Sequence, residues 1–268
     1  MRFTKMQGTG NDFVVINAIS ERLPSDLNAF ARGIADRKFG VGCDQVLIIR
    51  KSDRADFRMQ ILNNDGSEVE MCGNGIRCLA KYVHDKGITS KTKLEVETLA
   101  GLIRPEIVGD KVKVDMGEPK LASKDWPFGK TIKKRFEVES QTFEITLVSM
   151  GNPHCVIFVP EITDRLVLET GPKIENHSVF PNRINVEFVK AINPKELQMR
   201  VWERGTGETL ACGTGASAAG VAAVLNQLTE RSVTVHLKGG DLQIEWGEKN
   251  VFMTGPAKFV FEGELPIK

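Results

Sequence analysis

Two cysteines stand in matching glycine-rich turns, and their residue types and spacing suit acid–base chemistry. Cys72 is followed by Gly73-Asn74-Gly75, and Cys212 is followed by Gly213-Thr214-Gly215. A helix-forming run comes next in each case, so each thiol is expected just before a helix N-terminus. Unpaired N–H groups and the positive end of the helix dipole favour a thiolate there. The same N–H groups could hold a substrate carboxylate, because glycines let the backbone approach a ligand closely.

A pair of such thiols has a specific chemical use. If both reached one carbon atom, one thiolate could remove a proton from one side and the other thiol could deliver a proton to the opposite side. Inversion of configuration at a C–H carbon requires this arrangement. For a single cysteine, a small buried apolar residue is the more common interpretation, and we apply it to Cys43, Cys78 and Cys155.

Other kinds of site fit the sequence less well. It contains no C-x-x-C, no H-E-x-x-H and no His/Cys cluster with zinc spacing. Gly129-Lys130-Thr131 resembles the end of a P-loop, but Lys124 stands where that motif requires glycine. Neither glycine pair has the third glycine of a dinucleotide fingerprint, and no lysine has a context typical of a pyridoxal Schiff base. We therefore expect no metal and no organic cofactor.

The two turns belong to a longer internal repeat with an offset of about 140 residues. Four pairs of segments match in the same order: Gly10–Ile16 with Gly151–Ile157, Asp56–Asn63 with Glu196–Glu203, Glu68–Gly75 with Glu208–Gly215 and, more loosely, Met116–Pro119 with Thr254–Ala257. The repeat indicates two copies of one unit. We predict an N-terminal half over residues 1–118, against which the tail 260–268 could pack, and a C-terminal half over 119–259.

Each copy shows the same order of elements around its cysteine. β-rich runs come first, at Phe13–Ile16, Val46–Ile49, Val156–Val159 and Val186–Val189. Helical patterns follow at Ile76–Lys86 and Ala216–Leu228, and strands then resume. An early helix is expected after Ser25 as N-cap. The predicted fold is α+β: two pseudo-symmetric halves from an internal duplication, each a mostly antiparallel sheet or barrel around a central helix.

Composition excludes several functional classes. The 268 residues include 36 basic and 35 acidic side chains, a balance that argues against binding of nucleic acid by a basic face. No apolar run approaches the length of a membrane span, and the N-terminus lacks the pattern of a signal peptide. We therefore expect a cytoplasmic protein without membrane or nucleic-acid partners, whose five cysteines are reduced.

Around these turns the chain resembles the diaminopimelate epimerase family, from residue 3 to about residue 262. The motifs that carry the resemblance are Gly8–Phe13, Asn63-x-Asp65-Gly66-Ser67, Cys72–Cys78, Gly151–His154 and Glu203–Gly215. The resemblance implies a pyridoxal-independent enzyme that interconverts LL- and meso-diaminopimelate in lysine and peptidoglycan precursor biosynthesis. It also implies the family's fold, no cofactor, and a homodimer with one active site per chain between the two halves.

The resemblance also assigns individual residues. Cys72 and Cys212 match the two catalytic acid–base groups, and His154 and Glu203 match side chains that tune the thiols. The positions that match substrate-binding residues are Asn11, Gln45, Asn63, Gly73, Asn74, Asn152, Asn185, Glu203, Arg204, Gly213 and Thr214. Neutral amides suit a substrate with two ammonium and two carboxylate groups, because they bind it without shifting the thiol pKa values much. Arg204 could clamp the distal carboxylate with two hydrogen bonds.

Alternatives remain open at this point. A proline-type racemase or hydroxyproline epimerase would share the paired cysteines, although Asn63-x-Asp65-Gly66-Ser67 and Gly151–His154 favour diaminopimelate. A thiol-based redox sensor would instead join Cys72 to Cys212 in a disulfide. Taken singly, Asn152 is typical of a turn and His154 of a structural histidine.

Overall fold

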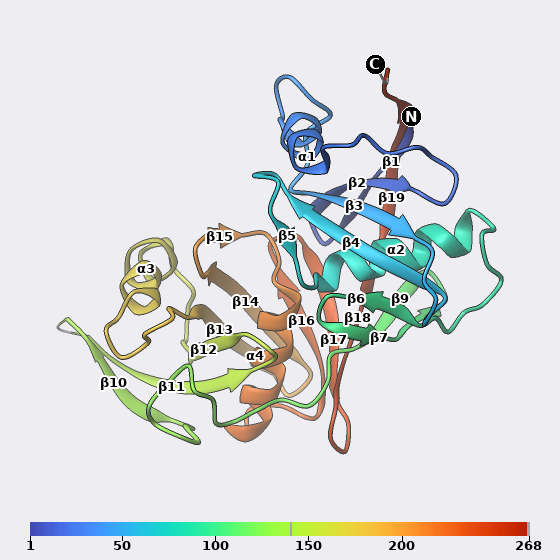
Figure 1. Cartoon of the computed structure of the whole chain (residues 1–268). Helices are drawn as coiled ribbons and strands as arrows, with labels where there is room; N and C mark the ends of the chain where they lie inside the picture. The colour runs from blue at the N-terminus through green and yellow to red at the C-terminus, as the bar shows by residue number, and fades with distance from the viewer. Residues whose placement is uncertain (140, 267–268) are drawn as a thin grey trace. The chain divides into compact units, whose positions relative to one another are not determined.

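The computed structural model describes residues 1–139 and 141–266, and its chain divides into two units (Figure 1). Unit 1 comprises residues 1–114 together with the C-terminal segment that starts at Gly255, and unit 2 comprises Asp115–Thr254. The boundaries fall within strand β9 (Lys111–Asp115) and strand β18 (Val251–Pro256). Within the described residues, no helix is long and apolar enough to span a membrane.

Unit 1 contains a mixed sheet with the strand order β19-β1-β2-β3-β4-β6-β7, in which β5 pairs with β4. Neighbouring strands run antiparallel, except for the parallel pairs β2–β3 and β4–β6. The strands are β1 (Arg2–Gly8), β2 (Asn11–Asn17), β3 (Gln45–Arg50), β4 (Phe57–Asn63), β5 (Glu68–Val69), β6 (Val96–Thr98), β7 (Gly101–Ile103) and β19 (Lys258–Glu264). Helices α1 (Leu27–Ala35) and α2 (Gly73–Asp85) complete the unit, together with the antiparallel pair of β8 (Pro105–Val108) and β9.

Unit 2 repeats this plan with the strand order β10-β11-β12-β13-β14-β16-β17-β18, in which β15 pairs with β14. The parallel pairs are β12–β13 and β14–β16. The strands are β10 (Lys134–Val138), β11 (Gln141–Ser149), β12 (Pro153–Phe158), β13 (Asn185–Asn193), β14 (Glu196–Glu203), β15 (Gly207–Thr209), β16 (Ser232–Leu237), β17 (Gly240–Trp246) and β18. A π-helical turn, η1 (Arg165–Thr170), precedes α3 (Gly171–Glu175), and α4 (Gly213–Leu225) follows β15.

The duplication predicted from four short matches is visible in strand pairing. The run β1-β2-β3-β4-β6-β7 corresponds to β11-β12-β13-β14-β16-β17, and each neighbouring pair has the same direction in both runs. The short strand before each cysteine pairs with the equivalent neighbour, β5 with β4 and β15 with β14. The α+β prediction of two similar halves, each with a mostly antiparallel sheet, is therefore confirmed.

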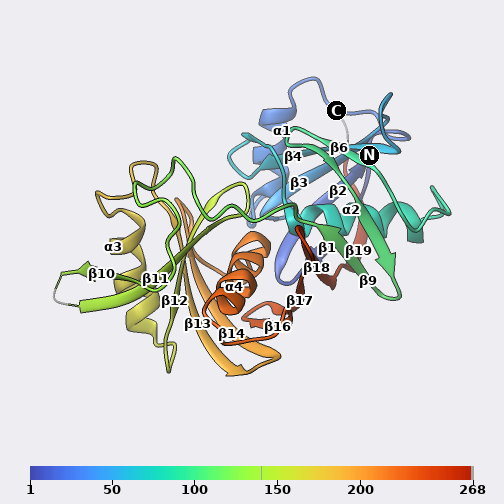
Figure 2. The same ribbon diagram turned by 90° about the horizontal axis from the view of Figure 1, so that it is seen from below.

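Strands β2 and β3 are apolar along their length because both faces of their sheet are covered. On one face, Ile16 and Ile48 belong to a buried cluster with Ile34 of α1. On the other, Phe13 and Leu47 lie close to Gly75 at the start of α2. Each central helix contacts several strands of its own unit: α2 contacts β1–β4, and α4 contacts β11–β14, β16 and β17 (Figure 2).

Both central helices begin earlier than the sequence pattern predicted. The patterns placed the starts at Ile76 and Ala216, but α2 starts at Gly73 and α4 at Gly213. The reason is that each cysteine is itself the N-cap, so the glycines form the first helical turn. The N-cap of α1 is also corrected, because Asp26 rather than Ser25 accepts the hydrogen bond from the Ala29 N–H.

Helix α4 is buried on nearly all sides, as its small apolar residues predicted. At Gly220 a side chain would not fit, because a Cβ atom there would lie 2.8 Å from the Ile244 side chain in β17. The close approach of this helix to its sheet therefore depends on glycine at that position.

Candidate active site

Cys72 is the N-cap of α2. Its backbone is extended, with φ −139° and ψ 117°, and its Sγ accepts a hydrogen bond from the Gly75 N–H at 3.4 Å. The thiol also lies 3.6 Å from Oδ1 of Asn11, to which its S–H donates. Asn74 donates to the same oxygen at 3.4 Å. The start of β2 and the start of α2 thus bring Asn11, Cys72 and Asn74 together.

Cys212 holds the equivalent place in unit 2. Its backbone has φ −120° and ψ 112°, and its Sγ accepts from the Gly215 N–H, again at 3.4 Å. The Thr214 hydroxyl lies 3.4 Å from the same sulfur. A sulfur at an N-cap faces the unpaired N–H groups of the first helical turn. The two turns predicted to carry chemistry are therefore built alike.

The electrostatic surroundings of Cys212 differ from the sequence-based expectation that a helix N-terminus lowers a thiol pKa. Burial raises the pKa of Cys212 well above its ordinary value, and the nearby carboxylates of Glu203 and Glu187 raise it further. Hydrogen bonds from Thr214 and Gly215 oppose this effect without reversing it. A pKa raised in this way favours the protonated form of the Cys212 thiol.

Glu203 lies beside Cys212 at the end of β14. Burial raises the pKa of its carboxyl, while hydrogen bonds from Thr209 and Cys212 act in the opposite direction. Arg204 follows at the exposed turn, where its Nη1 donates to the Asn182 carbonyl at 3.3 Å. The two neighbours therefore have different surroundings, with Glu203 buried beside the thiol and Arg204 exposed.

A chain of contacts links His154 to Cys212. His154 Nε2 lies 3.1 Å from Oδ1 of Asn152, whose Nδ2 donates to the Thr214 hydroxyl at 3.3 Å. On its other side, Nδ1 of His154 lies 2.6 Å from Oε1 of Glu187, and both side chains are fully buried. His154 therefore reaches the sulfur through Asn152 and Thr214.

Sequence reasoning missed Glu187. A signal was present, because Glu187 is a charged residue inside the apolar run of β13, two positions after Asn185 and therefore on the same face of the strand. Its carboxylate also lies against the helix start, since a Cβ atom at Gly215 would be only 2.8 Å from its Oε1.

The amide side chains of unit 1 fall into two groups. Asn11 contacts the thiol, whereas Gln45 and Asn63 are paired across β3 and β4, with Gln45 Nε2 donating to Asn63 Oδ1 at 2.9 Å. Asn63 in turn donates to the Ser67 hydroxyl at 3.0 Å. The Gln45 Oε1 atom is buried and has no hydrogen-bond partner. Such an atom is ready to accept a hydrogen bond from a ligand, because leaving it unpaired is unfavourable.

In unit 2, the Asn185 amide is already occupied by the protein. Its Nδ2 donates to the Pro153 carbonyl at 2.8 Å, and its Oδ1 accepts from the Arg204 N–H at 3.0 Å. This side chain therefore ties the start of β12 to the turn that carries Arg204.

Within the described part of the chain, no group of three or more His, Cys, Asp or Glu side chains is arranged to hold a metal ion.

The chain is similar to known proteins over its full length. The family model described as diaminopimelate epimerase matches residues 3–122 and 146–260. The diaminopimelate epimerase of Moorella thermoacetica is 50% identical over 278 residues, covering 100% of this chain and 100% of that protein.

Solved structures of lower identity share the fold. A phenazine biosynthesis protein of the PhzF family from Bacillus anthracis has a TM-score of 0.72 at 18% identity, covering 100% of this chain and 99% of that one. A hydroxyproline epimerase from Agrobacterium vitis has a TM-score of 0.70 at 16% identity, covering 98% of this chain and 91% of that one. From the full-length identity and the family match together, the chain belongs to the diaminopimelate epimerase family.

Proposed function

We propose that this protein interconverts LL- and meso-diaminopimelate by moving protons between an α-carbon and two thiols, those of Cys72 and Cys212. Membership of the family makes the chain an amino-acid isomerase, with diaminopimelate as substrate. The observation that carries the two-thiol mechanism is the pair of N-cap sulfurs, each held by the N–H three residues later. The proposal places the reaction in the biosynthesis of lysine and peptidoglycan precursors.

The proton steps balance without a cofactor. A thiolate takes the α-proton, so that an S–H bond forms, the C–H bond breaks and its electron pair stays on the carbon. The second thiol then gives its proton to the opposite face of that carbon and becomes a thiolate. Cys212 enters as the proton donor, because burial and neighbouring carboxylates raise its pKa. Cys72 acts first as the base once its S–H proton has passed to solvent, and the reverse reaction exchanges the two roles.

The carbanion formed in this reaction needs stabilisation, because an α-proton is far less acidic than a thiol. The first N–H groups of α2 and α4, at Gly73, Asn74, Gly213 and Thr214, are the proposed donors to the substrate carboxylate. A donor fixed in advance where negative charge develops lowers the activation free energy by about 3–4 kcal/mol. The two helix starts therefore serve both the thiols and the developing enediolate.

Acceptors and donors for the rest of the substrate are also proposed. Asn11 Oδ1 and the unpartnered Gln45 Oε1 suit ammonium groups, and exposed Arg204 suits the distal carboxylate. The remaining proposed contacts are Asn63, Asn152, Asn185 and Glu203. His154 and Glu203 are proposed to tune the Cys212 thiol, since both belong to its network of contacts.

We further propose that the protein acts as a homodimer. Strand β19 lies at the end of the strand order in unit 1, and Val260 and Phe261 there are 55% and 48% exposed. An edge strand with exposed apolar residues favours contact with a second copy. Sedimentation velocity on the wild type and a Val260→Lys variant tests this, and a wild type that is monomeric at micromolar concentration contradicts it.

A cytoplasmic location is proposed because the reaction requires Cys72 and Cys212 as reduced thiols, and reduced cysteines are typical of that compartment. Fractionation of the source cells tests this proposal, and recovery of the protein mainly outside the cytoplasm overturns it.

Proton NMR of LL-diaminopimelate with the reduced enzyme in D₂O tests the main proposal. The α-proton signal should disappear while the meso isomer accumulates. Cys72→Ser and Cys212→Ser should each abolish this, whereas Cys43→Ala, at a buried thiol with no proposed role, should retain it. Exchange with proline or hydroxyproline but not with diaminopimelate would establish the rival substrate class. No exchange with any of these substrates would refute the epimerase mechanism.

A further inference from the structure

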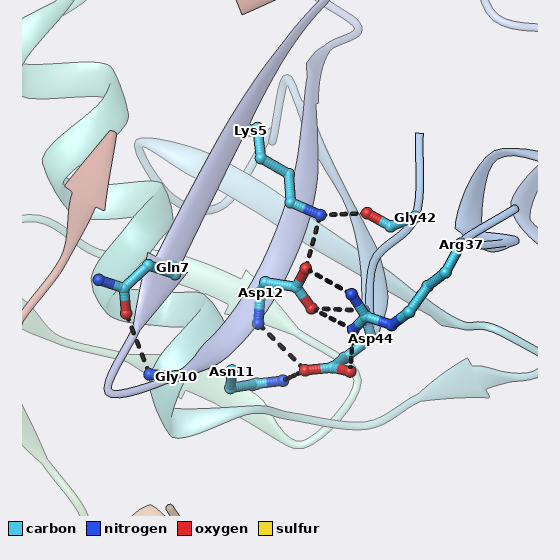
Figure 3. A network of polar contacts seen from close by, with 8 residues as sticks. All are labelled: Lys5, Gln7, Gly10, Asn11, Asp12, Arg37, Gly42 and Asp44. Atoms are coloured by element: carbon cyan, nitrogen blue, oxygen red, sulfur yellow. Dashed lines mark hydrogen bonds and ion pairs between the residues drawn. The ribbon is translucent and has the colours of Figure 1, made fainter. Parts of the chain in front are cut away.

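A cluster of charged side chains lies directly behind Asn11 in unit 1, and the proposed mechanism does not use it (Figure 3). We call Lys5, Asp12, Arg37 and Asp44 the Arg37 cluster. It joins β1, β2 and the loop that links α1 to β3.

The Arg37 guanidinium bridges the two carboxylates. Its Nη2 donates to Asp12 Oδ1 and to Asp44 Oδ1, both at 2.7 Å, and Nη1 donates to Asp12 Oδ2 at 3.1 Å. Lys5 Nζ lies 2.6 Å from Asp12 Oδ2 and also contacts the Gly42 carbonyl. Each cation therefore offsets a carboxylate, and Arg37 keeps the two acidic groups from moving apart.

Backbone contacts fix the two carboxylates further. The Asp12 N–H donates to Asp44 Oδ2 at 3.1 Å, and the Asp44 N–H donates to Asp12 Oδ1 at 3.0 Å. Asp12 and Asp44 thus each donate a backbone hydrogen bond to the carboxylate of the other. Such a network holds its members in one arrangement, because moving either carboxylate breaks several bonds at once.

Asp44 also determines how the Asn11 side chain is oriented. Asn11 Nδ2 donates to Asp44 Oδ2 at 3.0 Å. A carboxylate accepts hydrogen bonds and donates none, so the amide must present its NH₂ group to Asp44. The amide oxygen is therefore left on the other side, where it faces Cys72 Sγ at 3.6 Å and Asn74 Nδ2 at 3.4 Å.

We propose that Asp44, held in place by Arg37, is a positioning residue that keeps the Asn11 amide oxygen directed toward Cys72 and the substrate's ammonium group. The inference rests on the proposed function, in which Asn11 accepts a hydrogen bond from that group. Without Asp44 the amide can rotate by half a turn, and its NH₂ group then faces a substrate cation that it cannot bind.

The first test is a kinetic comparison of Asp44→Ala with the wild type, using the α-proton exchange assay. Loss of one hydrogen bond to a charged group raises KM for diaminopimelate about 10-fold. The turnover number should fall by a smaller factor than KM rises, because the helix N–H groups that hold the thiols and the substrate carboxylate are unchanged. General damage to the unit would instead lower kcat together with the melting temperature.

A double-mutant cycle with Arg37→Met separates positioning from independent effects. Arg37→Met should raise KM less than Asp44→Ala does, since Asp44 remains but loses its anchor. In the Asp44→Ala background, Arg37→Met should change KM by less than about twofold, because residues that act through one another are not additive. Since the Arg37 side chain is largely exposed, this variant also serves if Asp44→Ala does not fold.

The matched control is Arg54→Met. Arg54 is likewise an exposed arginine of unit 1, and it pairs with the carboxylate of Glu97. It is not a member of the Arg37 cluster that holds Asn11. Its KM should equal that of the wild type. An active wild type whose KM is unchanged in both Asp44→Ala and Arg37→Met refutes the positioning role. A wild type that exchanges no α-proton refutes the proposed function instead.

Discussion

Replacing Gly215 by alanine tests how tightly the turn around Cys212 is built. A Cβ atom at this position would lie 2.8 Å from Glu187 Oε1 and 3.3 Å from Cys212 Sγ. The carboxylate cannot easily withdraw, because it is buried and lies 2.6 Å from His154 Nδ1. The substitution must therefore move the carboxylate, the thiol or the helix start.

The duplication supplies a matched control in Gly75→Ala. Gly75 holds the same position in α2, but the nearest atoms to an added Cβ, in Cys72, Leu47 and Phe13, are all 3.4 Å away. Replacing a helical glycine by alanine contributes about 0.5–1 kcal/mol of stability, whereas overpacking costs about 1–3 kcal/mol. Gly215→Ala should therefore lose up to about 2 kcal/mol, and Gly75→Ala should gain about 0.5–1 kcal/mol.

Urea denaturation and thermal melting measure the difference between the two variants. At about 2–4 °C per kcal/mol for a protein of this size, the melting temperatures should differ by about 5 °C, with Gly215→Ala lower. The α-proton exchange rate of Gly215→Ala should fall at least about 10-fold, since a displacement near 1 Å can cost about 100-fold. Equal stability of the two alanine variants would show that the tight contact with Glu187 does not exist.

Three further predictions follow from the two thiols and the Arg37 cluster. Cys72→Ser and Cys212→Ser should each reduce epimerisation below detection. One of the two variants should retain elimination from a β-halogenated substrate, because that reaction needs a single base. Substrate NMR measures both reactions, and full epimerisation activity in both variants contradicts the two-thiol mechanism. Cys212 should be alkylated slowly by iodoacetamide near neutral pH, because its pKa is raised. Glu187→Gln should speed the alkylation, because it removes one of the carboxylates that raise this pKa. Peptide mass spectrometry measures the rate, and an unchanged rate in the variant argues against the effect of Glu187 on the thiol. Burial acts to raise the pKa of Asp12, but hydrogen bonds from Arg37 and Lys5 outweigh it and lower the pKa, so this carboxylate stabilises the fold above its unfolded pKa of about 4 and loses that effect as pH falls toward its native value. Asp12→Asn should therefore cost stability near pH 7 and progressively less below about pH 4, as measured by urea denaturation across that range; a difference that grows toward low pH reverses the sign of the argument.

The overall arrangement was accessible from sequence because duplication repeats both motifs and spacing. Matching four short segments was enough to predict two similar halves, and strand directions in the two sheets agree pair by pair. Helix starts were less predictable. The pattern placed each cysteine just before a helix, but glycine is a poor helix former, so the glycines of the first turn were left outside the predicted helices.

The electrostatics of the site could not be predicted from local sequence. The motif around Cys212 gave the helix start, which favours a thiolate, but not the carboxylates of Glu187 and Glu203 that act in the opposite direction. Glu187 lies 25 positions before Cys212 in the chain and comes close to it only through the pairing of β13 with β14. The same applies to Asp44 and Arg37, whose link to Asn11 depends on the parallel pairing of β2 and β3.

The N-cap sulfurs imply that catalysis alternately strengthens and weakens the two helix ends. In the proposed reaction a negative charge leaves one sulfur and appears on the other, and a charged cap stabilises a helix start more than a neutral one. While Cys72 is charged, the first turn of α2 is the more stable of the two. After a proton has moved to the Cys72 sulfur and Cys212 is charged, the first turn of α4 is the more stable one. In the complex with substrate, the hydrogen bonds from the Gly75 and Gly215 N–H groups to the two sulfurs should therefore change strength in opposite directions as the charge moves. Each proton transfer therefore changes the stability of two helix starts as well as the configuration of a carbon atom.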